Sequence, residues 1–482
     1  MTAPVQHPMY IDGQFVSGRG DGWIDVLNPA TEALLSRIPD GTAEEARLAI
    51  DAAERAQPGW EALPAIERAG WLRKIAAGIR QRADEIAGLI VAEGGKIQQL
   101  AAVEVAFTAD YLDYMAEWAR RYEGEIIQSD RPNENIFLFK RPHGVVAGIL
   151  PWNFPFFLIA RKMGPALLTG NTIVIKPSSV TPINAHVFAE IVDAAGLPKG
   201  VFNVVNGAGA EIGNYLAKHP QVDLVSLTGS VEAGRQVMIS AAENITKVSL
   251  ELGGKAPAIV LKDADLDLAV KSIVASRVIN SGQVCNCAER IYVQQDVHEA
   301  FVEKLTVAMQ QVRFGNPATA QDTLDMGPLV EKKAVEAVAA KVDKAVKQGA
   351  TLHLGGKRPD VKGFFFEPTI LTNVKNNMDI MHEETFGPVL PVTTFNTLDE
   401  AIAMANDSIF GLTSSVYTES LNDAFYITRR LQFGETYINR ENFEAMQGFH
   451  AGWKQSGIGG ADGKHGLEEY LLTQMVYLQT KR

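Results

Sequence analysis

The sequence predicts an α/β protein built on a doubly wound parallel sheet, and two observations support this fold class. From about residue 144 onward, short apolar runs alternate with helical stretches at the spacing of parallel βαβ units. A second α/β region extends over 253–433, with predicted helices over 264–279 and 331–348 and a strand at 291–293. Both regions are long enough to bury a core, so we expect the 482 residues to form two or three domains.

The composition is that of an ordinary globular protein and narrows the range of partners. Apolar residues make up 46% and charged residues 21% of the chain, and the formal net charge is −12. This acidic balance argues against nucleic acid or an anionic membrane as a partner. Residues 1–13 lack a secretory signal pattern, and prolines interrupt the short apolar stretch 145–160, so we expect no membrane span. Two cysteines form no disulfide framework, which suits the cytoplasm.

Residues 42–122 are predicted to be mostly helical. Thr42 and Glu45 have the spacing of a capping box, and amphipathic runs follow over 43–56 and 64–93. A pair of glycines then interrupts the periodic pattern.

Two further segments fall outside both predicted cores. Residues 123–140 have the pattern of a hairpin with its turn at 130–135, and the tail over 468–479 has the pattern of a strand. Because an exposed strand edge needs a partner, we expect these segments to pair subunits.

The α/β region that starts near residue 144 is the place to look for a ligand site. Ligands of doubly wound sheets bind at the carboxyl ends of the strands. The predicted strands are 145–150, 172–175, 201–205, 224–227 and 248–250, and the predicted helices between them are 183–195, 210–218 and 231–242.

Cys285 lies on a glycine-containing turn with the sequence Asn-Ser-Gly-Gln-Val-Cys-Asn-Cys. Its thiol is a candidate nucleophile, although a buried structural thiol explains a single cysteine as well. Cys287 is too close to Cys285 for an unstrained disulfide, and the chain offers no second ligand pair for a metal.

Glu251 and Asn153 each follow a predicted strand, at the mouth of the sheet. Burial of Glu251 there would raise its pKa toward that of a useful general base, while a salt-bridged carboxylate is the alternative. Prolines fix the backbone on both sides of Asn153, so its amide could be a rigid donor in an oxyanion hole. The alternative is a turn asparagine bonded to its own backbone.

Three further motifs suit a ligand that carries phosphate and ribose. Lys176 follows the second strand and could bind either group, although a solvated lysine is the commoner case. Gly229 and Ser230 stand between a strand and a helix, where close approach and the helix N-terminus favour phosphate. Glu384 could hold ribose hydroxyls and Phe386 could pack on a nicotinamide ring, but a plain loop explains both.

In this order and spacing, the motifs resemble those of the aldehyde dehydrogenase family over essentially the whole chain. The most specific are Ile-Leu-Pro-Trp-Asn-Phe-Pro at 149–155, Cys-Asn-Cys-Ala-Glu-Arg at 285–290 and Tyr-Ile-Asn-Arg-Glu-Asn-Phe-Glu at 437–444. Together with 446–463, they are similar to the bacterial members that oxidise lactaldehyde and glycolaldehyde.

The resemblance implies an aldehyde-dehydrogenase-like fold. Its parts would be a Rossmann-like parallel-sheet cofactor domain, an α/β catalytic domain and a small β extension for oligomerisation, usually in a homotetramer or dimer. We accordingly assign 1–122 and 141–252 to the dinucleotide-binding domain, 253–433 to the catalytic domain with 434–467 as its substrate-side and cofactor-side loops, and 123–140 and 468–482 to the oligomerisation strands.

The resemblance also implies a reaction. Cys285 would attack the aldehyde carbon, and the Asn153 amide would stabilise the oxyanion. Hydride would pass to a nicotinamide dinucleotide, and Glu251 would activate the water that hydrolyses the thioester. Cys287 would be a spare buried thiol, and no metal is expected. The expected dinucleotide contacts are Leu150, Pro151, Trp152, Lys176, Ser178, Ser179, Gly209, Gly229, Ser230, Gly234, Leu252, Glu384 and Phe386.

Polar positions that face the substrate in the lactaldehyde-oxidising group point to short 2-hydroxyaldehydes. A hydroxyl next to the aldehyde would bind such groups, and an analogue lacking it would leave them unpaired. Two alternatives stay open: Arg161 and Glu444 could form a structural ion pair, or Arg161 could bind the distal carboxylate of a substrate such as succinate semialdehyde. The expected substrate contacts are Asn153, Arg161, Cys285, Asn286, Glu444 and His450.

Other protein classes fit the sequence less well. Glu251 argues against a CoA-acylating enzyme, which needs no hydrolytic base. The presence of Cys285, Glu251 and Asn153 together argues against a structural, crystallin-like protein. A cysteine hydrolase is not supported, because no histidine stands near Cys285 in the sequence as its partner.

Ser179 departs from the family pattern. Relatives that prefer NAD usually carry a glutamate there, whose carboxylate binds the adenosine ribose and repels a 2′-phosphate. Since Ser179 removes the repulsion and Lys176 lies nearby, we expect NAD use with appreciable tolerance of NADP.

Overall fold

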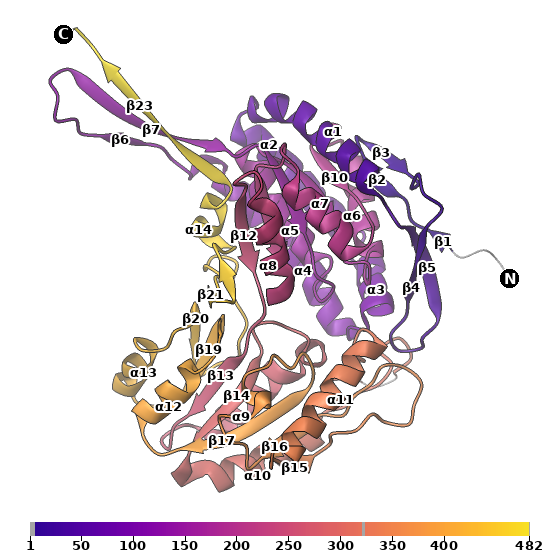
Figure 1. Cartoon of the computed structure of the whole chain (residues 1–482), viewed down its shortest axis with the longest axis vertical. Coiled ribbons are helices and arrows are strands. Elements are labelled where there is room, and N and C mark those ends of the chain that lie inside the picture. Colours follow the sequence, from indigo (N-terminus) through magenta and orange to yellow (C-terminus); the bar gives the residue numbers. More distant parts are fainter. Residues whose placement is uncertain (1–4, 321–322, 482) are drawn as a thin grey trace.

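The computed structural model describes residues 5–320 and 323–481. Residues 1–4 and 482, which the predicted segments 1–122 and 468–482 include, lie outside the described residues. Two sheet-centred halves make up the body, and a narrow three-stranded arm projects from the half that contains the N-terminal part of the chain (Figure 1). In the described ranges, no helix combines the length and apolar character that a bilayer span requires.

The first half is built on an eight-stranded sheet in the order β22-β12-β11-β8-β9-β10-β2-β3. Its five central strands are parallel and confirm the predicted βαβ region. Their order reverses between β8 and β11, and ligands of doubly wound sheets bind at this switch point. The strands are β8 (Val145–Ile149), β9 (Thr172–Lys176), β10 (Phe202–Val204), β11 (Leu224–Thr228) and β12 (Lys247–Glu251), and the helices between them are α5 (Phe157–Thr169), α6 (Ile183–Ala194), α7 (Gly209–Lys218) and α8 (Val231–Ala241).

Helices cover both faces of this sheet, which explains why its strands are continuous apolar runs. Alternate strand residues face opposite cores. Val146 and Ile173 pack toward one set of helices, whereas Val145 and Val174 pack toward the other. The first core contains α2 (Ala65–Gln81), α3 (Ala83–Gly94), α4 (Gln98–Glu117), α5 and α6, and the second contains α1 (Ala43–Glu61), α7 and α8.

The predicted helical region 42–122 is confirmed with two differences. The capping box of Thr42 and Glu45 is present at the start of α1. The single predicted run over 64–93 is two helices, because the backbone leaves the helical conformation at Arg82 and a new helix begins there. The five N-terminal strands were not predicted, since they are short and lack a clear alternating pattern. They are β1 (Val5–Gln6), β2 (Met9–Ile11), β3 (Gln14–Val16), β4 (Trp23–Leu27) and β5 (Leu34–Pro39).

The second half is built on a seven-stranded sheet in the order β15-β16-β17-β14-β13-β19-β20, parallel except for the β15–β16 pair. β20 belongs to this sheet although it follows residue 433; the domain boundaries stay a prediction. The strands are β13 (Ala256–Val260), β14 (Ala288–Gln294), β15 (Thr351–Leu354), β16 (Thr369–Thr372), β17 (Val389–Phe395), β19 (Thr413–Tyr417) and β20 (Glu435–Ile438), with α9 (Leu266–Val278), α10 (His298–Gln310), α11 (Lys332–Lys347), α12 (Leu398–Asn406) and α13 (Leu421–Thr428).

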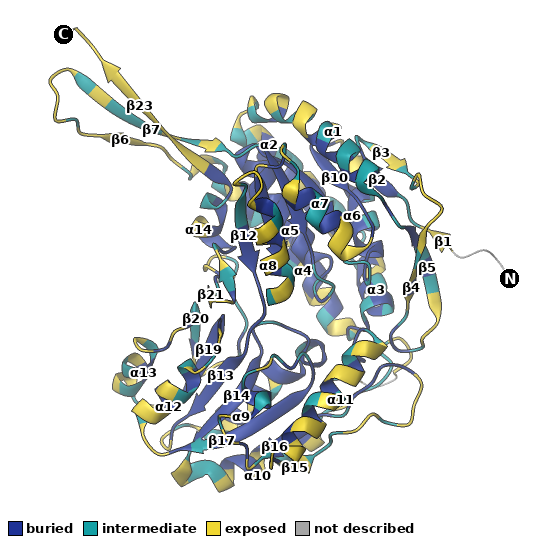
Figure 2. Cartoon of the chain, viewed as in Figure 1, coloured by how far each residue is buried: buried dark blue, intermediate teal, exposed yellow. Residues whose placement is uncertain are grey.

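The arm confirms the predicted hairpin and tail strand. β7 (Glu134–Pro142) pairs antiparallel with β6 (Glu125–Ile127) on one side and with β23 (Leu471–Gln479) on the other. Most of the arm is exposed (Figure 2), and β23 is exposed at every position after its first residue.

A late segment connects the two halves. β21 (Trp453–Lys454) pairs with β18 (Phe410–Gly411) in the second half, whereas β22 (Gly457–Ile458) pairs with β12 in the first. The short helix α14 (Gly463–Glu468) then leads into the arm.

Candidate active site

The carboxyl ends of the first sheet face the amino ends of the second sheet across a cavity of about 440 Å³. β12 ends at Glu251 and the chain crosses directly to β13, which begins at Ala256. Asn153 follows β8, and Cys285 precedes β14. The cavity therefore brings together Asn153, Glu251 and Cys285, which come from three distant parts of the sequence.

Cys285 follows a loop with three consecutive residues in the left-handed region. Asn280, Ser281 and Gly282 have φ values of 45°, 59° and 77°. A Cβ at Gly282 would stand 2.4 Å from the Gly387 carbonyl oxygen, so the position requires glycine. The buried Arg277 donates from Nε to the Gly387 carbonyl at 2.8 Å and from Nη2 to the Gly282 carbonyl at 3.2 Å. These contacts fix the loop that presents the sulfur.

The two thiols differ in their surroundings. Burial raises the pKa of the Cys285 thiol, while a hydrogen bond with His450 acts in the opposite direction. Burial raises the pKa of Cys287 to about 12, and its side chain is 1% exposed. Cys287 therefore stays a neutral, inaccessible thiol at neutral pH.

Asn153 has features of both predicted roles. Its Oδ1 accepts a hydrogen bond from the Phe154 backbone N–H at 3.1 Å, as in an asparagine turn. Its Nδ2 donates to the Gln283 carbonyl at 3.0 Å, two residues before Cys285. An amide nitrogen carries two hydrogens, so one N–H remains beyond the Gln283 bond.

A buried ion pair that was not singled out from the sequence supports the Asn153 loop. Lys96 Nζ lies 2.5 Å from Glu104 Oε2 and donates to the Asn153 carbonyl at 2.8 Å. Glu104 Oε1 accepts the N–H groups of Phe156 and Phe157 at 3.0 and 3.1 Å, at the start of α5. The only signal in the sequence was a pair of charged residues in an otherwise amphipathic helical region.

Glu251 is buried, but the predicted rise of its pKa is wrong. Burial alone would raise the pKa of this carboxyl group, yet the positive charges of Arg161, Lys162 and His450 outweigh it and lower the pKa. Glu251 Oε2 lies 3.7 Å from Arg161 Nη1 and accepts a hydrogen bond from the Thr228 hydroxyl at 3.2 Å. The group is therefore an ionised carboxylate at neutral pH, ready to accept a proton but a weaker base than predicted.

Arg161, in α5, stands among three carboxylates. Its Nε donates to Asp462 Oδ1 at 3.0 Å, and a second bond joins Nη2 to the other Asp462 oxygen. Glu444 lies 3.5 Å away and Glu251 3.7 Å away. Asn286 donates from Nδ2 to Glu444. The predicted Arg161–Glu444 ion pair is thus one side of a larger buried cluster, in which Asp462 is the residue that the sequence did not reveal.

His450 is near enough to Cys285 to influence its pKa, although it is far from Cys285 in the sequence, and it does not line the cavity. The ring is 2% exposed, and its influence on the Cys285 thiol lowers the pKa of that thiol, against the effect of burial. Its Nδ1 lies 2.7 Å from Glu435 Oε1, at the start of β20. Sequence spacing could not reveal this proximity, because a loop far along the chain brings His450 back toward the site.

The other end of the cavity lies at the switch point between β8 and β11. Lys176 is buried and donates to the Pro177 carbonyl at 2.9 Å, and burial lowers its pKa to about 8. Ser230 caps α8 by accepting the Ala233 N–H at 3.2 Å. The predicted dinucleotide contacts that line this end are Leu150, Pro151, Trp152, Lys176, Ser178, Ser179, Gly209, Gly229, Ser230, Leu252, Glu384 and Phe386.

Gly234 is the predicted dinucleotide contact that does not line the cavity. A Cβ at this position would stand 2.6 Å from a methyl group of Leu252. Close packing between α8 and the Leu252 side chain therefore accounts for the glycine.

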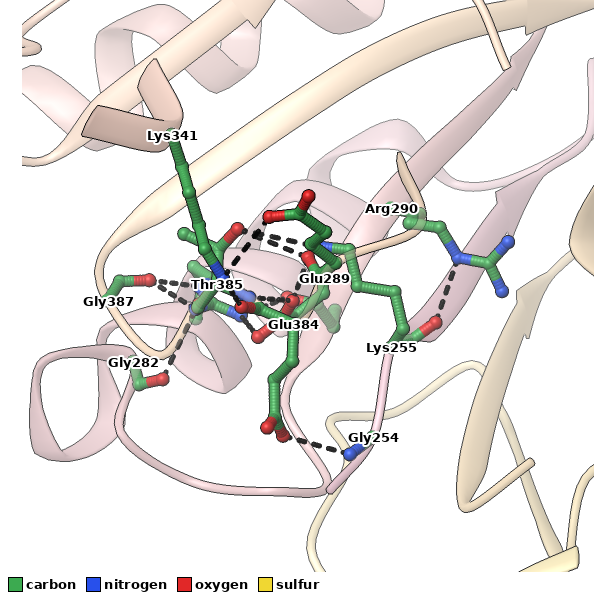
Figure 3. Close-up of polar contacts among 12 residues, drawn as sticks. Gly254, Lys255, Gly282, Glu289, Arg290, Lys341, Glu384, Thr385 and Gly387 are labelled. Carbon is green, nitrogen blue, oxygen red and sulfur yellow. Dashed lines mark hydrogen bonds and ion pairs between the residues drawn. The ribbon is translucent and has the colours of Figure 1, made fainter. Parts of the chain in front are cut away.

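Glu384 projects toward Gly254 from a loop braced by buried charges (Figure 3). Its Oε1 accepts the Gly254 N–H at 2.9 Å, and burial followed by repulsion from Glu289 raises its pKa to about 7. Glu289 in turn lies 2.6 Å from Lys255 Nζ and accepts the Thr385 N–H at 2.8 Å. This network fixes the loop that carries both Glu384 and the Phe386 ring.

The donor and acceptor set at this end fits a nicotinamide dinucleotide. Lys176 supplies an ammonium group whose only bonded acceptor in the described ranges is a backbone carbonyl. Glu384 supplies a carboxylate for ribose hydroxyls, and the N-terminus of α8 supplies free N–H groups for phosphate. Phe386 stands edge-on to Trp152, with ring centroids 5.6 Å apart, and lines the same cavity as Asn153, Glu251 and Cys285.

Comparison with known proteins agrees with this geometry. Residues 15–476 match the aldehyde dehydrogenase family. The chain belongs to this family. It is 71% identical over 480 residues to lactaldehyde dehydrogenase of Escherichia coli K12, with 100% of both chains covered. A crystal structure of the E. coli lactaldehyde dehydrogenase superposes with a TM-score of 0.98 and 72% identity, covering 99% of this chain and 100% of that one. A 3,6-anhydro-alpha-L-galactose dehydrogenase of Vibrio sp. EJY3 is 44% identical, covering 98% and 99%.

Family membership confirms three predictions made from the sequence. The chain has the aldehyde dehydrogenase fold, it is an oxidoreductase, and its family uses NAD(P). The resemblance to bacterial lactaldehyde dehydrogenase is confirmed as well. The roles of the individual residues stay predictions.

Proposed function

We propose that the enzyme oxidises short 2-hydroxyaldehydes, lactaldehyde to lactate and glycolaldehyde to glycolate, with NAD or NADP as hydride acceptor. The observation that carries this proposal is the polar cluster of Asn286, Glu444 and Arg161 beside Cys285. The 71% identity to the E. coli lactaldehyde dehydrogenase supports it.

Aromatic side chains close the substrate end and favour a small molecule. Phe107 packs against Phe157 with ring centroids 4.9 Å apart and against Phe443 at 6.1 Å. The Arg161 guanidinium stands 5.4 Å from the Phe157 ring centroid. Against these apolar walls, Glu444 offers a carboxylate that can accept a hydrogen bond from a substrate hydroxyl.

Cys285 and Asn153 carry the first half of the reaction. The Cys285 sulfur attacks the aldehyde carbon, and the new C–S bond moves negative charge onto the aldehyde oxygen. The remaining Asn153 N–H and the Cys285 backbone N–H stabilise that charge. When bound beside Phe386, the dinucleotide supplies the acceptor that takes hydride from the adduct.

Glu251 completes the reaction on the thioester that remains on Cys285. Its ionised carboxylate accepts a proton from water as the water attacks the thioester carbonyl. Arg161 and Lys162 stabilise the carboxylate between turnovers, because both positive charges lie close to it.

The Arg161 cluster argues against a semialdehyde substrate. Arg161 already contacts Asp462, Glu444 and Glu251, so a distal carboxylate would meet three negative charges before it met a free cation. The structural-ion-pair alternative therefore describes Arg161 well, while Glu444 retains the exposure needed to contact a substrate.

The test is kcat/KM for lactaldehyde, glycolaldehyde, propanal and succinate semialdehyde, each with NAD and NADP. We expect propanal to be poorer than lactaldehyde by on the order of 10²-fold or more, because it leaves the polar groups unpaired. Glu444→Gln should narrow this gap, while Glu441→Gln, a change at an exposed neighbour, should not. Equal values for lactaldehyde and propanal would contradict the proposal.

We also propose a cytoplasmic homotetramer with the arm as a subunit contact. Both cysteines are free, which suits a reducing compartment. β6 and β23 are the edge strands of the arm, and Ile126 and Tyr477 on them are 77% and 62% exposed. Light scattering on the full chain and on Ile126→Lys tests the contact, since a smaller assembly is expected for the variant.

A further inference from the structure

The loop that carries Glu384 is held from two sides. The buried Arg277 on α9 donates to the carbonyls of Thr385 and Gly387. From α11, Lys341 donates from Nζ to the Glu384 carbonyl. Lys341, which was not singled out from the sequence, thus bonds the backbone of a residue that lines the cavity.

α11 is fixed to this loop by packing as well as by the Lys341 bond. The helix buries Val338 in the core of the second half. A Cβ at Gly387 would stand 2.6 Å from a Val338 methyl group, so the loop backbone touches the helix there. Lys341 follows Val338 by about one helical turn, which brings its Nζ to the Glu384 carbonyl (Figure 3).

The Glu384 carboxylate lies on the other side of the loop and is closely fitted. In Figure 3 it points toward Gly254, away from Lys341. Its Oε1 accepts the Gly254 N–H at 2.9 Å, and a Cβ at Gly253 would stand 2.6 Å from its Oε2. Even a small shift of the Glu384 backbone would therefore displace the carboxylate from this fit.

Two lysines on this part of α11 differ in what they contact. Lys344 is 50% exposed and pairs with the side chains of Asp379 at 2.7 Å and Glu383 at 3.3 Å. Lys341 is 28% exposed, and its Nζ lies 3.9 Å from Glu383 Oε2 besides bonding the Glu384 backbone. Lys344 therefore provides a matched control, with a similar charge on the same helix and contacts at the surface.

The charges around Glu384 bear on its ionisation. Burial and repulsion from Glu289 raise its pKa to about 7, while the positive charges of Lys255 and Lys341 act in the opposite direction. Lys255 Nζ lies 2.6 Å from Glu289, which balances its charge, and Glu384 itself opposes ionisation of the Cys285 thiol. Loss of the Lys341 charge should therefore raise the pKa of Glu384 further and leave more of this carboxyl group protonated at pH 7.

We propose that Lys341 is a positioning residue for the dinucleotide. By holding the Glu384 carbonyl, it fixes the Glu384 carboxylate where it meets the ribose hydroxyls, and it fixes the Phe386 ring beside the nicotinamide. Since Glu384 and Phe386 are two residues apart on one loop, the ribose concerned is the one that carries the nicotinamide. The inference rests on the proposed dinucleotide contacts of Glu384 and Phe386.

The experiment measures the Kd of NADH and of NADPH by fluorescence titration on the full chain, without aldehyde, at pH 7 and at about pH 9. We compare the wild type with Lys341→Met, Lys341→Arg and the control Lys344→Met. Lys341→Met is also measured in a Glu384→Ala background, beside Glu384→Ala alone. Circular dichroism and Tm check the fold of each variant.

The Kd of NADH at pH 7 should rise about fivefold or more in Lys341→Met, because a charged hydrogen bond that holds the loop is lost. The rise should be smaller at about pH 9, where more of Glu384 is ionised in the variant. Lys341→Arg should recover most of the affinity, and Lys344→Met should stay within about twofold of the wild type. An unchanged Kd in Lys341→Met would overturn the proposal. If that variant does not fold, Lys341→Gln takes its place, and an unchanged Kd there overturns it as well.

Two comparisons separate positioning from direct contact. In the Glu384→Ala background, Lys341→Met should add about twofold at most, since Lys341 acts through Glu384. The full loss in that background would mean that Lys341 contacts the dinucleotide itself, and the inference would fail. NADH and NADPH should lose affinity by the same factor because they share the ribose next to the nicotinamide. A loss confined to NADPH would place Lys341 at the 2′-phosphate and refute the proposed role.

Glu384→Ala alone keeps a failure of the underlying proposal distinguishable. If it binds both dinucleotides as tightly as the wild type, the proposed contact of Glu384 fails, and the Lys341 inference fails with it. A loss in Glu384→Ala without one in Lys341→Met refutes the Lys341 inference alone. Because no aldehyde is present, the result does not depend on which substrate the enzyme oxidises.

Discussion

The two ends of the cavity treat buried positive charge in opposite ways. At the substrate end, Arg161 is paired with Asp462, Glu444 and Glu251. At the proposed dinucleotide end, Lys176 is equally buried, its one bonded acceptor among the described residues is a backbone carbonyl, and burial lowers its pKa to about 8. An unpaired buried charge destabilises the folded state. A buried ion pair becomes strongly destabilising when one partner is removed. The charge of Arg161 is thus balanced within the protein, whereas Lys176 fits the anionic dinucleotide that we propose for its end of the cavity.

The largest expected effect tests whether the substrate end performs the chemistry at all. Cys285→Ala should lower kcat by on the order of 10⁴-fold or more, because the other cysteine, Cys287, is buried and cannot replace the sulfur. Dinucleotide binding, followed by fluorescence titration, should be retained. Cys287→Ala is the matched control and should keep activity within about threefold. Appreciable dehydrogenase turnover by Cys285→Ala would show that Cys285 is not the nucleophile and that the chemistry does not depend on this end of the cavity.

Removing the paired cation tests the neutralised end. Arg161→Gln leaves the buried Asp462 and Glu251 and the partly buried Glu444 without their cation, so we expect a loss of about 3–5 kcal/mol in the free energy of unfolding. The control is Arg80→Gln, whose partners Asp110 and Asp113 are exposed, with an expected loss below about 1 kcal/mol. Urea unfolding measures both. Similar losses of unfolding free energy in the two variants would show that Arg161 contributes no more to stability than an exposed arginine.

Replacing Lys176 should not destabilise the protein, in contrast to replacing Arg161. Lys176→Met should leave Tm unchanged or higher, because the folded state lowers the pKa of this lysine and so disfavours its charged form at pH 7. The KM for NAD should rise about tenfold, since a charged hydrogen bond to the ligand is lost. In the wild type, this KM should also rise as the pH passes about 8 and the ammonium loses its proton, while the Lys176→Met profile stays flat there. A marked fall in Tm would contradict a ligand-directed role.

The smallest expected effect concerns Ser179 and the choice between NAD and NADP. Ser179→Glu should lower kcat/KM for NADP by about tenfold through repulsion of the 2′-phosphate, with NAD changed by less than about twofold. Ser179→Gln introduces a side chain of the same size without the charge, and it should change kcat/KM for neither NADP nor NAD strongly. If the NADP/NAD ratio is unchanged in Ser179→Glu, this serine does not set the preference.

Residues at strand ends could be predicted from the sequence because local pattern sets them. Asn153, Lys176 and Glu251 each follow an apolar run, and parallel strands bring their carboxyl ends to one edge. His450, Glu435 and Asp462 could not be found in this way. Their positions depend on how a late loop pairs with distant strands, and no periodicity encodes that pairing. The pKa direction of Glu251 was missed for the same reason, since its counter-charges come from α5 and from that loop.

The segment 453–458 sets a limit on how ligands reach the cavity. β21 is paired with the second half and β22 with the first, and between them Ser456 accepts the Leu252 N–H at 2.8 Å and donates to the Gly253 carbonyl at 2.7 Å. A movement that separated the two halves would break these strand pairings and hydrogen bonds. We therefore expect ligands to enter and leave the cavity without a separation of the two halves.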